Sequence, residues 1–84
     1  MATMTMNPAT PVQGGTAELC YNPAPSQPVD VEILWIPPSL GTQTCTLTAD
    51  QPCCEITIPE GADGYRCEDQ SGQAEDISGF VDRP

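Results

Sequence analysis

The stretch GADGYRCEDQSG, residues 61–72, places a short alternating segment between two turn signals. Tyr65 and Cys67 fall on one side of an extended chain, because successive side chains of a strand point to opposite faces. Arg66 and Glu68 fall on the other side. Glycine and aspartate before this segment, and Ser-Gly after it, favour turns. The stretch therefore predicts a half-buried β-strand whose apolar face carries a tyrosine and a cysteine.

The same pattern recurs along the chain, with turn signals roughly every 8–12 residues, which is the spacing of a β-sandwich. In the most regular segment, VDVEILWIP, one face is formed by Val29, Val31, Ile33 and Trp35. The predicted strands are residues 2–6, 16–21, 29–37, 42–48, 53–59, 64–69 and 76–81. No segment has a helical period of useful length. We therefore expect an all-β domain of about seven antiparallel strands with no substantial helix.

The length of the chain limits its architecture, and its net charge limits the partners that it can bind. At 84 residues the chain is one domain, 1–84, with a core that is marginal without cross-links or partners. Twelve acidic residues against two arginines, with no lysine or histidine, give a net charge of −10. This charge repels phosphate backbones, so we expect no nucleic-acid binding, and no stretch is apolar for long enough to insert into a membrane. A basic protein partner would suit the charge.

Three residues together resemble the signature of immunoglobulin-like β-sandwich domains, in which paired cysteines pack against a tryptophan: Cys20, Trp35 and Cys67. Trp35 lies 15 residues after Cys20, and Cys67 lies 47 after it, which suits a short seven-stranded layout. Tyr65 resembles the tyrosine corner of this family, whose hydroxyl bonds to upstream backbone. The opening P-x-x-P-V-x-G-G-x-A-E-L, residues 8–19, is similar to the first-to-second strand passage of bacterial and viral modules. The resemblance implies a small immunoglobulin-like antiparallel sandwich.

The resemblance also implies a disulfide between Cys20 and Cys67, but the alternation opposes it. Leu19 and Tyr21 share one face, which leaves Cys20 on the opposite face, away from an inward Cys67. This pairing therefore stays open. If the second and fifth strands are neighbours, as in this family, an outward Cys53 could meet Cys20.

The residues that separate Cys45 from Cys54 indicate that these two cysteines meet. Folding TLTADQPC about its turn places Cys45 opposite Cys54, and both lie on inward-facing positions, so a bridge or a packed thiol pair fits. Five cysteines cannot all pair within one chain, so at least one thiol is free or intermolecular. The residues expected to have structural roles are Cys20, Trp35, Cys45, Cys53, Cys54, Tyr65 and Cys67.

The chain lacks the groups that catalysis usually needs. A nucleophilic cysteine requires a base or a positive field, and there is no histidine, no lysine, and an Arg66 that points away from Cys67. We expect no enzyme activity and no cofactor. The adjacent pair Cys53–Cys54 is a poor metal chelate, because neighbouring strand side chains point apart. A calcium site is the alternative to a solvated acidic surface at Glu60, Asp63, Glu68, Asp69, Glu75 and Asp76.

A fold typical of exposed surfaces, no catalytic groups, and a methionine start without an export signal favour an attachment module. We expect a virion accessory or capsid decoration protein, made in the host cytoplasm, that binds protein partners and reinforces a larger oligomeric or lattice-like assembly. Docking would use a sheet edge or an extended N-terminal arm, residues 1–10, which could add a strand to a neighbour. The alternative is a secreted or cell-surface adhesion or carbohydrate-binding module.

Overall fold

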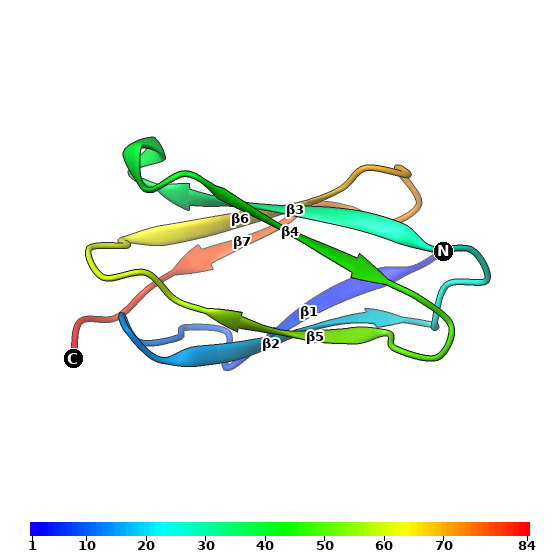
Figure 1. Cartoon of the computed structure of the whole chain (residues 1–84), viewed down its shortest axis with the longest axis horizontal. Coiled ribbons are helices and arrows are strands. Elements are labelled where there is room, and N and C mark those ends of the chain that lie inside the picture. The colour runs from blue at the N-terminus through cyan, green and yellow to red at the C-terminus, as the bar shows by residue number, and fades with distance from the viewer.

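The computed structural model describes all 84 residues and contains two antiparallel sheets that face one another (Figure 1). The three-stranded sheet consists, in spatial order, of β1 (Thr3–Asn7), β2 (Thr16–Asn22) and β5 (Cys53–Thr57). The four-stranded sheet consists of β4 (Thr42–Leu47), β3 (Val29–Ile36), β6 (Gly64–Asp69) and β7 (Ile77–Phe80). The only helical element is a single 3₁₀ turn, η1 (Pro38–Leu40). The predicted all-β class is confirmed, and each predicted segment overlaps one strand.

The period-2 alternation decides which side chains form the core. In β3 the burial follows the sequence pattern, and Trp35 is only 2% exposed. In β2 the buried side chains are Ala17, Leu19 and Tyr21, as the alternation predicts. Seventeen buried residues, from both sheets and from the connections between strands, form one hydrophobic cluster. Burial of this apolar surface is the main source of stability in so small a domain.

The connection between β4 and β5 differs from the sequence prediction. A local hairpin was expected, with Cys45 directly opposite Cys54, but β4 pairs with β3 and β5 pairs with β2. The chain crosses from one sheet to the other at residues 48–52, where the Thr48 N–H donates to the Gln51 carbonyl. The hairpin prediction was wrong because a turn signal does not show whether the next strand returns to the same sheet.

The predicted Cys45–Cys54 disulfide is nevertheless present, with the Cα atoms 6.5 Å apart. It joins the edge strands β4 and β5 across the gap between the two sheets, since both cysteines face inward. On the opposite side of the sandwich the sheets meet through isolated parallel bridges, Ala2 to Ala74 and Val12 to Asp82. The two sheets are therefore tied together on both sides of the sandwich.

The N-terminal segment is not a free arm. Five residues of it form β1, an edge strand that pairs along its length with β2. Met4 and Met6 are buried in the core, because they alternate with threonines and therefore point to one face. Only a detached arm would take Met4 and Met6 out of the core, whereas β1 in place could pair with a neighbour through its free outer edge. The chain has no helix that is long and apolar enough to cross a membrane.

Tyr65 links the four-stranded sheet to the connection between β1 and β2. Its hydroxyl donates a hydrogen bond of 2.7 Å to the Ala9 carbonyl, far upstream in the chain. The ring lies over Gly79, its direct neighbour on β7, and a Cβ at that glycine would come within 2.6 Å of the tyrosine hydroxyl. Burial raises the pKa of Tyr65 above its ordinary value, so the hydroxyl remains a donor.

Candidate functional site

One disulfide, whose two cysteines are half-buried, lies on the outer face of the three-stranded sheet. Cys20 lies directly opposite Cys53 in the ladder between β2 and β5, and the two are bridged with a Cα separation of 4.0 Å. The next pair, Tyr21 and Pro52, is joined by an N–H to carbonyl hydrogen bond of 2.8 Å, so the cysteines occupy a non-hydrogen-bonded pair, where side chains are closest. The Cys20–Cys67 bridge implied by the resemblance does not form, because alternation directs Leu19 and Tyr21 inward and Cys20 outward.

Cys67 is the free thiol of the chain and lies fully within the core. Its neighbours in the sheet are Ile33 on β3 and Ile77 on β7. Burial raises the pKa of the thiol to about 12, so it stays protonated at neutral pH. A protonated, inaccessible thiol cannot act as a nucleophile. Cys67 therefore contributes as a small apolar core residue.

Asp69 is a buried acid for which sequence analysis did not predict a structural role. Its Oδ2 accepts from the Tyr21 hydroxyl at 2.6 Å and from the Ala74 N–H at 3.0 Å. Its Oδ1 accepts from the N–H and the hydroxyl of Ser71, at 2.9 and 2.7 Å. Burial opposes ionisation, but these hydrogen bonds outweigh it and hold the pKa of Asp69 below its ordinary value. The local Asp-x-Ser pattern is the signal that could have indicated this turn.

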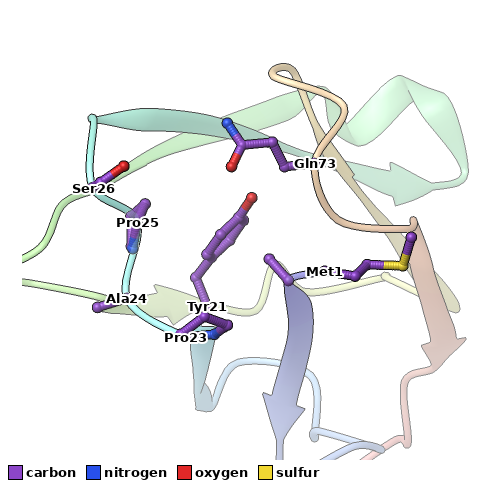
Figure 2. A pocket seen from close by; sticks show the side chains of 8 residues that line it. Met1, Tyr21, Pro23, Ala24, Pro25, Ser26 and Gln73 are labelled. Carbon is purple, nitrogen blue, oxygen red and sulfur yellow. The ribbon is translucent and has the colours of Figure 1, made fainter.

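The loop-end hollow lies where the chain begins, and has a volume of about 430 Å³ (Figure 2). Its walls are Met1, Ala2, Tyr21, Pro23, Ala24, Pro25, Ser26 and Gln73. In Figure 2 the Tyr21 side chain stands between the β2–β3 connection and Met1, with Gln73 beyond its hydroxyl. No acidic or basic side chain lines this hollow. Its side chains offer contacts to an apolar or uncharged polar group.

A second feature, which we call the Phe80 face, lies on the outer side of the four-stranded sheet. It is one cross-strand row formed by Ile36 on β3, Gly64 on β6 and Phe80 on β7. Phe80 is 81% exposed and Ile36 is 50% exposed. Because Gly64 has no side chain, a hollow of about 410 Å³ remains at this row, and Asp63 and Ser78 also line it.

The same outer surface is acidic beyond this row. In the next row Arg66 lies between Leu34 and Ser78, and it forms ion pairs with Glu68 at 3.0 Å and Asp76 at 2.6 Å. These two acids neutralise the one cationic side chain of these rows. In the row next to the Phe80 face, the positive charge of Arg66 is therefore compensated.

The acids considered for calcium do not form a cage. None of the six belongs to a group of three acidic or cysteine side chains whose ligand atoms lie within 4.8 Å of one another. Asp69 is committed to hydrogen bonds, and Glu68 and Asp76 to Arg66. The one group that meets this distance is Glu18, Cys20 and Cys53, on the outer face of the three-stranded sheet.

Comparisons with known proteins found no matching family model, no similar curated protein and no similar solved structure.

Proposed function

We propose that this domain is a non-enzymatic attachment module that binds a protein partner in a larger assembly through the Phe80 face. The observation that carries the proposal is the exposure of Phe80, the only phenylalanine of the chain, beside Ile36 and the hollow over Gly64. Aromatic side chains next to a pocket are the usual anchors of protein interfaces, because each removes a large apolar area from water. Within its own chain, the Phe80 side chain stays largely exposed to water.

The negative charge of the domain favours a basic partner. Asp63 lines the hollow, and the chain carries −10 in total. A partner surface with an apolar side chain for the hollow and lysine or arginine around it would be attracted at long range and paired on contact. A second copy of this chain would place like charges against each other, so we propose a basic partner of different sequence.

The assembly we propose is a virion, in which the domain is an accessory or capsid decoration protein. A small sandwich whose sheets are tied together on both sides, by a disulfide and by backbone bridges, suits a site on an exposed surface. The antiparallel two-sheet sandwich, with Trp35 buried in its core, supports this by analogy between folds.

A second candidate is a secreted or cell-surface adhesion or carbohydrate-binding module. Two disulfides favour an oxidising environment, and the loop-end hollow would be its binding site. Uncharged groups such as Ser26 and Gln73 beside the Tyr21 ring would suit a neutral glycan.

Site-specific photo-cross-linking, carried out where the protein is naturally produced and assembled, tests both candidate functions. A photoreactive residue replaces Phe80 in one variant, Ala24 of the loop-end hollow in another, and the exposed Thr5 of the opposite sheet in a control. We expect position 80 to label one basic structural protein of a purified particle, while positions 24 and 5 do not. Labelling at position 24 alone would favour the second candidate. Equal labelling at all three positions, or none in material that retains the domain, would overturn the proposal.

A further inference from the structure

We propose that the outer face of the three-stranded sheet is a redox-controlled metal site. Reduction of the Cys20–Cys53 disulfide would release two sulfur ligands that, together with Glu18 and Glu55, bind one thiophilic divalent cation such as Zn²⁺. This inference does not depend on the Phe80 face, which lies on the outer side of the other sheet.

The ladder between β2 and β5 places these four side chains together. Cys20 is opposite Cys53, and two residues away Glu18 is opposite Glu55, so all four share one face. The sulfur atoms and a carboxylate oxygen of Glu18 lie within 4.8 Å of one another, and Glu18 Oε1 is 3.5 Å from Cys20 Sγ. Because a disulfide sulfur carries no proton, this last approach is a contact and not a hydrogen bond.

These separations are close to what a tetrahedral metal needs. Ligand atoms that lie 2.0–2.3 Å from a zinc ion are roughly 3–4 Å apart from one another. Breaking the S–S bond lets the two sulfurs separate to that spacing by side-chain rotation alone. Glu55 is directly across from Glu18 and two positions from Cys53 but lies outside the 4.8 Å group, so its carboxylate must turn toward the sulfurs to become the fourth ligand.

An independent feature of the same face favours a cation. Two glutamates directly opposite each other in an antiparallel pair repel, which costs stability. A divalent ion held between them removes this repulsion. Thiolates select zinc over calcium or magnesium, so the site would differ from the oxygen cage considered for the acids of the last strands.

A dithiol reductant can open the Cys20–Cys53 disulfide, because it supplies the two electrons and two protons that the reaction needs. One thiolate of the reductant attacks a sulfur of the Cys20–Cys53 bond, and the second closes the reductant's own disulfide, which transfers two electrons to the protein. The two protons of the reductant pass to Cys20 and Cys53. When Zn²⁺ binds, both protons leave to solvent, and two thiolates and two carboxylates surround the ion.

The other cysteines do not offer such a site. Cys45 and Cys54 pack against the core, and Cys67 is buried. Cys53 and Cys54 point to opposite faces, so the adjacent pair is a poor chelate, as its spacing predicts. The ligands come instead from a cross-strand pair, which only the pairing of β2 with β5 reveals.

The test uses the full chain, reduced with a dithiol, freed of reductant without oxygen, and mixed with Zn²⁺ or Co²⁺ alone. Native mass spectrometry should show one metal ion bound to the reduced chain and none to the oxidised chain. Co²⁺ should give a thiolate charge-transfer band. Zn²⁺ should protect Cys20 and Cys53 from alkylation while Cys45 and Cys54 are modified.

Matched variants separate this site from adventitious binding by thiols. Replacement of Cys20 and Cys53 by alanine should abolish binding, whereas the same change at Cys45 and Cys54 should retain it. Glu18→Gln and Glu55→Gln should each weaken affinity by on the order of 10–100-fold or more. Equal binding by the Cys20→Ala/Cys53→Ala variant, or protection of Cys45 and Cys54 instead, would overturn the proposal. So would a reduced chain that unfolds and is not refolded by Zn²⁺.

Discussion

The Tyr21 hydroxyl donates a buried hydrogen bond of 2.6 Å to Oδ2 of Asp69, which joins β2 of one sheet to the end of β6 in the other. Asp69 also accepts from Ser71 and Ala74, so the same carboxylate orders the β6–β7 loop. One acid therefore connects the two layers and shapes one end of the domain.

Asp69→Asn should lower the free energy of unfolding by about 1–3 kcal/mol, because an amide cannot replace all of these charge-assisted bonds and the Tyr21 and Ala74 donors are buried. Tyr21→Phe should cost about 1–2 kcal/mol, since it removes one donor and leaves the others. Chemical denaturation with both disulfides intact measures these values. Equal stability of Asp69→Asn and the parent chain would contradict this role.

Stability should fall in acid because of the same group. The pKa of Asp69 is lower in the folded chain than its ordinary value of 3.8, so the folded state favours the carboxylate. This contribution is fully present above the ordinary value and is lost as the pH falls through the folded pKa. Denaturation at several pH values should show a smaller loss of stability in this acid range for Asp69→Asn than for the parent.

The two disulfides should contribute unequally. The chain-entropy model gives about 4 kcal/mol for Cys20–Cys53, whose members are 33 residues apart, and about 3 kcal/mol for Cys45–Cys54, 9 apart. We therefore expect the paired alanine variant at positions 20 and 53 to unfold at lower denaturant than the pair at 45 and 54. The reverse order would show that the Cys45–Cys54 bridge stabilises the domain more by joining the two sheets than the Cys20–Cys53 bridge does by closing the longer loop.

Gly79 should tolerate no side chain. A Cβ there would lie 2.6–2.8 Å from the hydroxyl and ring of Tyr65, so Gly79→Ala must displace the ring from its bond to Ala9. We expect a loss of about 1–3 kcal/mol from this overpacking. Ser78→Ala, at an exposed position of the same strand, is the control and should change stability by less than about 0.5 kcal/mol.

Cys67 should be unreactive in the folded chain. Its thiol is buried and its pKa is raised to about 12, so alkylation at pH 7–8 requires unfolding. Mass spectrometry should detect one alkylated cysteine only after denaturation without reductant. Rapid labelling under native conditions would instead indicate an accessible, activated thiol and would reopen the question of catalysis.

Local pattern was enough to predict the strands, since the alternation of buried and exposed side chains is a property of consecutive residues. It also correctly directed Cys20 outward, against the pairing that the immunoglobulin-like signature implies. It did not reveal that β4 and β5 join different sheets, because a turn of similar composition serves both a hairpin and a crossover. The local pattern does not show the role of Asp69, because its main partner, Tyr21, is 48 residues away.

The amino-acid sequence alone determined the all-β class, the inward faces of the strands and the acidic surface, since each depends on residue type and near neighbours. Only the tertiary structure decided which cysteines meet, that Tyr65 requires a glycine at position 79, and that Glu18 and Glu55 flank a disulfide. These relationships arise from strand pairing between segments distant in the chain. Their register is set by the packing of the whole core and not by any local stretch.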